Sequence, residues 1–245
     1  MAKKARFLFE FNNYSIPIEL VKEWRRSVRV SIARKGAYLR VPQVMPSILI
    51  EKEIAKAKHW IQKTIAKNPP AFARFRNEAY PDHFEKSVYG ETFFIHVERS
   101  DRKTNSGKIK GDNLYLTLSD QLTAYQEKDV IKKLQSRLFG QYFLPKVTDR
   151  VRHINEVSYQ KNFETVRLKY NQSNWGSCSS ASNLNFSTRL LLTPPQVIDY
   201  VIVHELAHLT EMNHSKKFWD LVEKVMPSYK EKEDWLDEHG AACDF

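Results

Sequence analysis

Three histidines and one glutamate lie close together in an otherwise apolar stretch of the chain. The stretch "YVIVHELAHLTEMNHSKKFW" (200–219) contains His204, Glu205, His208 and His214. Two imidazoles four residues apart on a helix stack on one face, one turn apart, and can bind the same metal ion. Zinc takes nitrogen ligands at about 2.0–2.1 Å and prefers a tetrahedral shell. The spacing therefore predicts a metal site on a helix, with one zinc ion per chain.

Glu205 directly follows the first histidine, so on a helix it projects near the metal without having to ligate it. There a carboxylate can accept a proton from metal-bound water, which is the general-base role of the H-E-x-x-H pattern. A catalytic zinc site also needs a third protein ligand and an open position. His214 is the best candidate for that ligand, and Glu223, the best placed acid on the next predicted helix, is the alternative.

The segments around this motif carry start and stop signals for helices. Thr193 is predicted as the N-cap of the motif helix, with Pro194 at its first position and Gln196 completing a capping box. Asn213 is expected to end the helix in a left-handed conformation, so that the chain returns His214 to the metal. Ser215 is predicted to cap a further helix, whose Phe218, Leu221, Val222 and Val225 would hold His214 in place by packing.

Upstream, the apolar pattern alternates between strand and helix periods. Residues 27–41 predict a β-hairpin with a turn at 34–36, and 47–67 predict an amphipathic helix with a lysine-rich flank. Residues 87–118 indicate further β-structure around a polar turn at 100–113, and 120–151 indicate a helix. Strands at 164–172 and 184–192 would form a hairpin before the motif. No internal repeat or low-complexity segment stands out.

Composition excludes several classes of protein. No apolar run approaches the length of a membrane span, the two cysteines are far apart, and polar residues interrupt the apolar N-terminal stretch. These features predict a cytoplasmic protein without a signal peptide and without a membrane partner. The formal net charge of +10 makes nucleic acid a possible partner.

The segment from Trp175 to Trp219 resembles the YgjP-like zinc metallopeptidase family, which is related to SprT-like and other H-E-x-x-H domains. The similarity rests on "WGSC" (175–178), the Thr-Pro-Pro helix entry (193–195), the motif itself, and "NHS" (213–215) followed by Phe218-Trp219. By this resemblance, His204, His208 and His214 are the zinc ligands and Glu205 is the catalytic base.

The resemblance also implies a fold. It predicts an α+β chain in which a zincin-like catalytic domain, with a small sheet and an active-site helix, follows a β-rich N-terminal region with one long helix. The boundary is expected at residue 120, giving 1–120 and 121–245, unless both form one continuous domain. In zincins an edge strand pairs with extended substrate. Trp175, Gly176 and Ser177 are therefore candidate substrate-binding residues, and Cys178 is expected to be a small buried residue.

Three functions are compatible with these residues. The first is a zinc-dependent metallopeptidase acting on a peptide or protein through zinc-activated water. The second is a metal-dependent phosphohydrolase acting on nucleotides, although the chain has no Gly-rich phosphate loop. The third is a nucleic-acid-associated binding module, for which no recognisable motif is present. The peptidase is the preferred hypothesis.

Overall fold

The computed structural model describes residues 4–33, 35–78 and 80–245, and the chain is a mixed α+β protein. The described residues form three small sheets and five α-helices. Contacts between residues divide the chain into two compact units. Unit 1 comprises residues 1–80 with 123–125, and unit 2 comprises 81–122 with 126–245. The predicted division at residue 120 stays a prediction. None of the described helices is long and apolar enough to cross a membrane.

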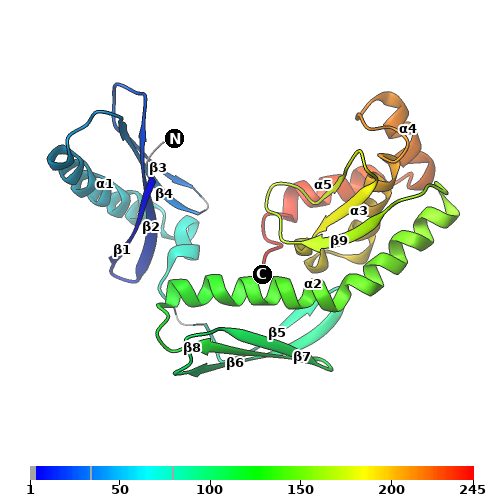
Figure 1. Ribbon diagram of the computed structural model, residues 1–245, viewed down its shortest axis with the longest axis horizontal. Coiled ribbons are helices and arrows are strands. Elements are labelled where there is room, and N and C mark those ends of the chain that lie inside the picture. The colour runs from blue at the N-terminus through cyan, green and yellow to red at the C-terminus, as the bar shows by residue number, and fades with distance from the viewer. Residues whose placement is uncertain (1–3, 34, 79) are drawn as a thin grey trace. The chain divides into compact units, whose positions relative to one another are not determined.

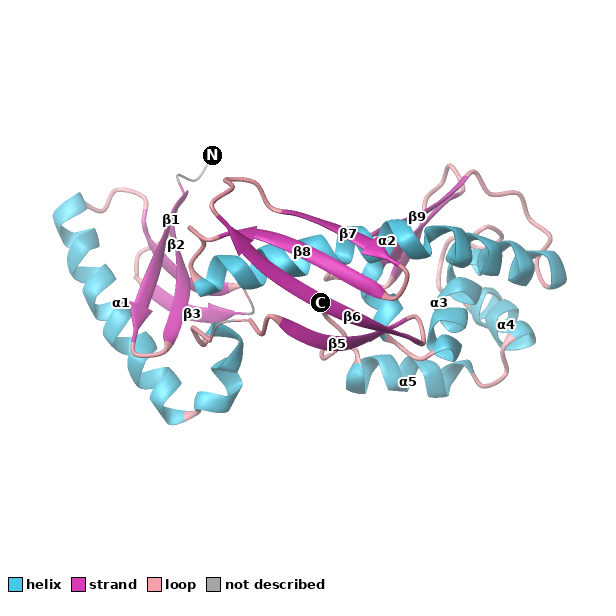
Figure 2. Ribbon diagram, turned by 90° about the horizontal axis from the view of Figure 1, so that it is seen from below, coloured by secondary structure: helices cyan, strands magenta, loops and turns pink. Residues whose placement is uncertain are grey.

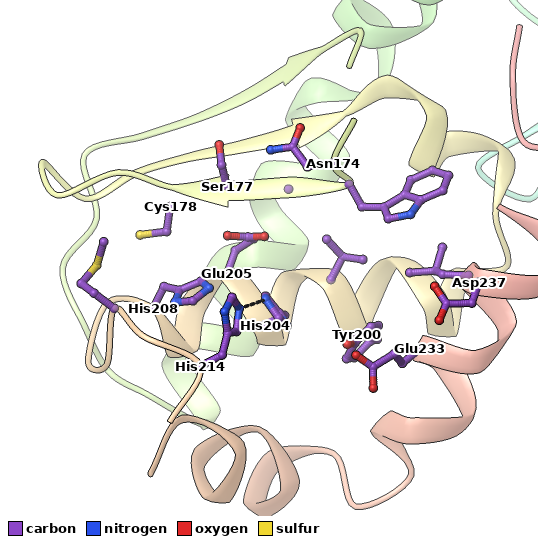
Figure 3. Close-up of a pocket in the computed structure, with 15 residues that line it drawn as sticks. Asn174, Ser177, Cys178, Tyr200, His204, Glu205, His208, His214, Glu233 and Asp237 are labelled. Carbon is purple, nitrogen blue, oxygen red and sulfur yellow. Dashed lines mark hydrogen bonds between the residues drawn. The ribbon is translucent and has the colours of Figure 1, made fainter. Parts of the chain in front are cut away.

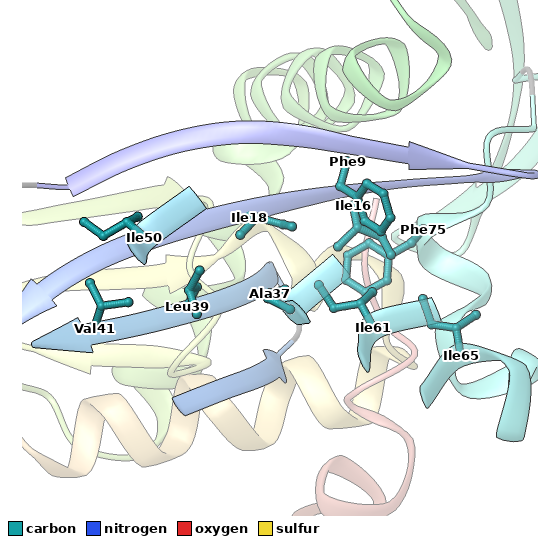
Figure 4. Packing of buried hydrophobic residues seen from close by; sticks show 11 residues of the cluster. Phe9, Ile16, Ile18, Ala37, Leu39, Val41, Ile50, Ile61, Ile65 and Phe75 are labelled. Atoms are coloured by element: carbon teal, nitrogen blue, oxygen red, sulfur yellow. The ribbon is translucent and has the colours of Figure 1, made fainter. Parts of the chain in front are cut away.

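Unit 1 is a four-stranded sheet with one face covered by a helix. Its strand order is β1-β2-β4-β3, with β2 and β4 parallel and the other neighbours antiparallel. Alternate residues of these strands, such as Ile16, Ile18 and Leu39, pack against the helix and form the core (Figure 4). The elements are β1 (Lys4–Phe11), β2 (Tyr14–Glu23), β3 (Arg29–Ala33), β4 (Gly36–Pro42), α1 (Ser47–Lys67) and the 3-10 helix η1 (Pro69–Phe75).

The predictions for unit 1 are confirmed. β3 and β4 form the expected antiparallel hairpin, although Arg34 of its turn lies outside the described residues. The helix predicted for 47–67 has those bounds, and Ile50, Ala57, Ile61 and Ile65 are its buried residues. Local periodicity was sufficient here because one face of each element is apolar and the other is charged.

Unit 2 begins with a second four-stranded sheet followed by a long helix. The helix α2 (Ala124–Val157) lies along one face of this sheet (Figure 1), and Phe139 and Phe143 on α2 contact Phe93. The strands are β5 (His83–Val88), β6 (Glu91–Ser100), β7 (Ser106–Lys110) and β8 (Asn113–Ser119).

The polar turn predicted at 100–113 is wrong in part, because it contains strand β7. β7 is an edge strand of sequence "SGKIK", whose single large apolar residue is Ile109. Edge strands are commonly short and lysine-rich, so the segment lacked the alternation that predicts a strand.

The two four-stranded sheets have the same topology, which corrects the expectation of no internal repeat. The second sheet has the order β5-β6-β8-β7, with β6 and β8 parallel and both outer pairs antiparallel, and a helix follows it. Figure 2 shows the strands of both sheets. Residues 4–67 and 83–157 are thus two copies of one strand-strand-strand-strand-helix arrangement. The repeat was not visible in the sequence because topology is set by which strands pair, not by residue identity.

The C-terminal half of unit 2 carries the motif on a small three-stranded sheet and three helices. Its elements are β9 (Thr165–Lys169), β10 (Gly176–Cys178), β11 (Asn183–Ser187), the 3-10 helix η2 (Thr188–Leu192), α3 (Pro195–Ala207), α4 (Lys216–Val225) and α5 (Tyr229–His239). The sheet order is β10-β11-β9, so β10 is an edge strand beside α3.

The predicted hairpin between 164–172 and 184–192 is wrong. β9 and β11 pair in parallel, and the antiparallel partner of β11 is β10, which lies in a segment predicted to be a loop. Alternating apolar residues predict that a segment is a strand but carry no information on the direction of its pairing.

The predicted start of the motif helix is displaced by one residue. Pro194 is the N-cap and Pro195 the first helical residue, and no side chain caps the helix. The Thr193 hydroxyl instead donates to the Leu190 carbonyl oxygen at 2.8 Å, where it closes the last turn of η2. The two prolines therefore determine where α3 begins.

Candidate metal centre

The three histidines of the motif converge on one point. His204 lies on α3, His208 is its C-cap residue, and His214 lies in the following loop. One ring nitrogen from each lies within 4.8 Å of the other two, and His204 Nε2 is 3.0 Å from His214 Nε2 (Figure 3). Tetrahedral zinc ligands at 2.0–2.1 Å are about 3.3 Å apart. The donor set and spacing therefore fit a zinc ion with little rearrangement.

The loop between His208 and His214 fixes one of these rings. His208 Nδ1 lies 3.1 Å from the Glu211 carbonyl oxygen, so a proton on Nδ1 leaves Nε2 free to bind a metal. The predicted left-handed Asn213 is wrong, because Asn213 is not among the described residues with positive φ. Its carbonyl oxygen accepts from the Ser215 N–H at 2.7 Å, and that tight turn reverses the chain instead.

Helix α4 supports the cluster from below, as the sequence predicts. The Ser215 side chain accepts a hydrogen bond from the Phe218 N–H and caps α4. The fully buried Phe218 ring contacts all three imidazoles, with centroids 4.8, 4.5 and 4.8 Å from those of His204, His208 and His214. One aromatic ring thus restricts all three rotamers.

Burial keeps the imidazoles of His204 and His208 in the form that binds metal. The pKa of His204 is lowered to about 3, chiefly by desolvation and then by the neighbouring His208 and His214. Desolvation also lowers the pKa of His208. Both rings are therefore neutral near pH 7 and offer a nitrogen lone pair.

The Glu205 carboxyl lies between α3 and the edge strand β10 (Figure 3). It is 4% exposed, and its Oε2 atom is buried without a hydrogen-bond partner among the described residues. Desolvation raises its pKa to about 8, while a hydrogen bond from the Cys178 backbone N–H acts in the opposite direction. A buried oxygen without a partner is costly, so this atom is available for a ligand or water beside the histidines.

Gly176 makes room for this carboxyl. A Cβ atom at position 176 would lie 2.5 Å from Glu205 Oε1 and 2.7 Å from its Cγ. The group that approaches the backbone of β10 at this position is the Glu205 side chain. Only glycine fits here without displacing either β10 or the carboxyl.

The histidines and Glu205 open into a cleft of about 500 Å³. Trp175, Gly176 and Ser177, predicted to bind substrate, lie along one side of it, and Tyr200 lies further along α3. Sequence reasoning missed the residues from α5 and neighbouring loops, because nothing local to them signals the cleft. These additional lining residues include Asn174, Met212, Glu233 and Asp237.

Trp175 is held in place by a buried arginine. The Arg189 guanidinium lies 4.2 Å from the centroid of the Trp175 ring, and its Nε donates to the Cys243 carbonyl oxygen at 2.8 Å. Arg189 is 3% exposed. A buried charge needs partners of this kind. Because these partners are Trp175 and Cys243, Arg189 links the start of β10 to the C-terminal segment. The sequence offered no signal for this role.

The geometry does not favour Glu223 as a metal ligand or a catalytic role for Cys178. Glu223 is exposed on α4 and belongs neither to the histidine cluster nor to the lining of the cleft. Cys178 is half-buried and lines the cleft, which corrects the expectation of a buried residue. Desolvation and the nearby Glu205 raise the pKa of its thiol to about 11. A thiol with such a pKa is protonated at neutral pH and is a poor nucleophile.

Comparisons with known proteins identify the family to which the chain belongs. Two solved structures of metallopeptidase zymogens match the chain, each with a TM-score of 0.35. Pyrococcus abyssi abylysin is 28% identical and matches over 37% of this chain and 90% of its own. Methanocaldococcus jannaschii jannalysin is 19% identical and matches over 38% of this chain and 94% of its own. No curated protein matches significantly. The family model for the YgjP-like metallopeptidase domain matches residues 26–239, so the chain belongs to that family.

Proposed function

We propose that this protein is a zinc-dependent peptidase whose ligands are His204, His208 and His214 and whose general base is Glu205. The observation that supports it most directly is the buried Glu205 oxygen without a partner, on the residue next to a three-histidine cluster. Family membership supports a metal-dependent hydrolase. The histidine donor set favours zinc among the metals used for hydrolysis.

Zinc bound by the three histidines would polarise the scissile carbonyl and lower the pKa of a reacting water. Glu205 accepts the proton of the attacking water and then passes it to the leaving amine. Its enclosure between α3 and β10 holds the carboxylate in one orientation, and Gly176 sets its distance from the strand. Phe218 keeps the three imidazoles aligned during the reaction.

The substrate of this proposal is an extended peptide. β10 is an edge strand whose residues line the cleft, so its free backbone groups are available to a peptide strand. Gly176 lies on the side of β10 that faces away from β11 and supplies that edge, whereas Ser177 and Trp175 line the cleft beside it. Hydrogen bonds between β10 and the peptide backbone do not depend on the amino-acid sequence of the peptide. The side chains that line the cleft therefore determine which peptides bind.

A nucleotide substrate is less well supported by the same cleft. Among the described residues that line it, none is a lysine or arginine, whereas Glu205, Glu233 and Asp237 are acidic. A triphosphate requires cations or backbone N–H groups to offset its charge. The peptidase is therefore the preferred function, and nucleotide hydrolysis is an outcome of the test below.

The test measures metal content and turnover together. Purified wild type is expected to hold one zinc per chain and to cleave unfolded proteins, and Glu205→Gln is expected to keep the zinc and lose turnover by a factor of at least about 100. Nucleoside triphosphates are assayed in parallel. Glu205-dependent triphosphate cleavage without peptide cleavage would replace the proposed function while keeping the site. A chain that takes up no zinc would overturn both.

The ligand assignment has its own test. We expect His214→Ala to lose zinc at concentrations of a competing chelator that leave wild type loaded, because one of three protein ligands is gone. Glu223→Ala is the matched control and is expected to retain wild-type zinc affinity. If instead Glu223→Ala lost zinc and His214→Ala retained it, Glu223 and not His214 would be the third ligand.

A further inference from the structure

The excess of positive charge in this protein belongs to one part of the chain. Residues 1–80 contain 17 lysines and arginines against 6 aspartates and glutamates, a net charge of +11. Residues 81–245 contain 22 against 23, a net charge of −1. The charge of the whole protein is therefore the charge of unit 1, which carries none of the metal site. Such segregation is unnecessary for solubility and points to an anionic partner of unit 1.

Within unit 1, two arginines face each other on the sheet. Arg29 of β3 and Arg40 of β4 are directly paired residues of the antiparallel ladder. They lie on the face opposite α1, since Leu39 and Val41 point into the core between them and the helix. Arg40 donates to the Ser31 hydroxyl at 3.1 Å and lies 5.2 Å from the centroid of the Tyr38 ring. No carboxylate pairs with either arginine among the described residues.

Like charges directly opposite each other destabilise a sheet. The second copy of the arrangement shows that the fold does not require them. There the corresponding first pair of the β7–β8 ladder is Ser106 and Thr117, a neutral pair typical of sheets. Tyr115 occupies the place of Tyr38 in that copy, two residues before Thr117. The arginine pair is thus specific to unit 1 and costs stability unless an anion neutralises it.

An exposed tryptophan lies at the same end of the sheet. Trp24 directly follows β2 and is 89% exposed. β2 and β4 are parallel and end together, with Glu23 paired to Pro42, and Arg29 begins β3 after the short loop that contains Trp24. Arg26 in this loop is exposed. A nearly fully exposed tryptophan contributes nothing to the core, so its aromatic faces are available for stacking.

We propose that the outer face of the first sheet, with the loop 24–28, binds single-stranded nucleic acid. Arg29 and Arg40 would contact the phosphates, and Trp24 would stack on a base, with Tyr38 beneath Arg40 as a second aromatic surface. Positive grooves with interleaved aromatic residues are the common device for binding single strands. The charge of the unit complements a polyanion. Arg29, Arg40 and Tyr38 lie within the strands on one face of the sheet, and this placement favours a nucleic acid over a membrane surface.

The proposal is tested by binding of fluorescent oligothymidylate and oligouridylate, each of about 20 nucleotides, to the full chain over a series of salt concentrations. The variant Arg29→Ser/Arg40→Thr imports the residues of the second copy and is therefore expected to fold. Loss of two phosphate contacts should reduce the salt slope by about 1.4 and weaken binding roughly 25-fold at 0.1 M salt. A difference between the two oligonucleotides would assign the natural strand as DNA or RNA.

The matched control is Lys63→Ala/Lys67→Ala, which removes the same charge from the exposed face of α1. We expect this variant to bind nearly as well as wild type. Trp24→Ala should weaken binding about tenfold without changing the salt slope, and Trp24→Phe should restore most of it.

Equal weakening by both charge variants would overturn the assigned surface, since attraction would then follow net charge alone. Wild-type protein that binds neither oligonucleotide at low salt would overturn the proposal. The proposal would also be overturned if wild type bound phosphatidylserine vesicles or polyglutamate more tightly than oligonucleotides and this binding depended on Arg29 and Arg40. Metal content and peptide turnover are expected to be unchanged in Arg29→Ser/Arg40→Thr, so this inference and the proposed function fail independently.

Discussion

At the scale of single residues, the close contact between Glu205 and Gly176 constrains the position of the candidate base. The carboxyl is buried against a strand that has no side chain at this position, and the Cys178 N–H holds one side of it. General-base catalysis depends on the position of the carboxylate to within a fraction of an ångström. A glycine in an edge strand thus controls a group on a helix that is 29 residues further along the chain.

This contact predicts the effect of the smallest possible substitution. In Gly176→Ala, the new Cβ would overlap Glu205 Oε1, so the carboxyl must move and kcat should fall about 100-fold. Zinc content should be unchanged, because the three atoms nearest to the added Cβ all belong to Glu205 and not to a histidine. The neighbouring Ser177→Ala is the control, and steady-state kinetics are expected to show its kcat within a few-fold of wild type. An active Gly176→Ala enzyme would mean that Glu205 is not held by β10.

At the scale of elements, α5 completes the cleft that α3 and β10 begin. It places Glu233 and Asp237 at the end of the cleft away from the histidines, beside Tyr200 of α3 (Figure 3). Burial raises the pKa of Tyr200, and Glu233 adds to the effect through its charge and a hydrogen bond. A cleft end with two carboxylates and no lysine or arginine among its described residues favours a cationic group.

We therefore expect the peptidase to prefer peptides with lysine or arginine near the scissile bond. Glu233→Gln/Asp237→Asn should lower kcat/KM for such peptides about tenfold, which corresponds to two moderate charge pairs. Peptides with alanine or leucine at the same position should be affected little. Glu238→Gln on the same helix, outside the cleft, is the control. An equal loss on neutral peptides would show a structural and not a selective role for these acids.

At the scale of the molecule, the C-terminal residues join the parts of unit 2. The Phe245 ring stacks on Phe139 of α2 with centroids 5.9 Å apart, and Lys86 of β5 lies 5.2 Å from the Phe245 ring. Asp244 forms an ion pair with Lys132 and accepts from the Tyr170 hydroxyl at 2.9 Å. The last two residues therefore link the second sheet, α2 and the segment that follows β9.

This arrangement predicts how stability depends on pH. Desolvation lowers the pKa of Lys86 from 10.5 to about 8. Between pH 8 and pH 10.5, Lys86 is protonated in the unfolded chain but neutral in the folded one. The free energy of unfolding therefore rises with pH across this range. Below pH 8 the charged form is penalised, and Lys86→Met should stabilise the protein there by on the order of 2 kcal/mol.

The advantage of Lys86→Met should shrink as pH approaches 10.5. Urea unfolding of both proteins at pH 7 and at pH 10 measures this difference. Lys133→Met, which changes an exposed lysine on α2, is the control and should alter stability little at either pH. A constant difference between wild type and Lys86→Met at the two pH values would contradict the lowered pKa.

The amino-acid sequence by itself determined the parts of this protein that depend on near neighbours. The spacing of His204, His208 and His214, the Ser215 cap and the bounds of α1 are properties of one or two turns of chain, where periodicity and capping dominate. The three histidines converge in the structure as their spacing predicts. Local signals were therefore sufficient to find the candidate site.

Only the tertiary structure decided what depends on contacts between distant segments. The parallel pairing of β9 with β11, the hidden strand β7 and the repeated sheet topology follow from which strands meet. The approach of Gly176 to Glu205, the acids contributed by α5 and the facing pair of Arg29 and Arg40 have the same origin. Alternation and propensity specify that a segment is a strand, but its partner and direction are set by the packing of the whole chain.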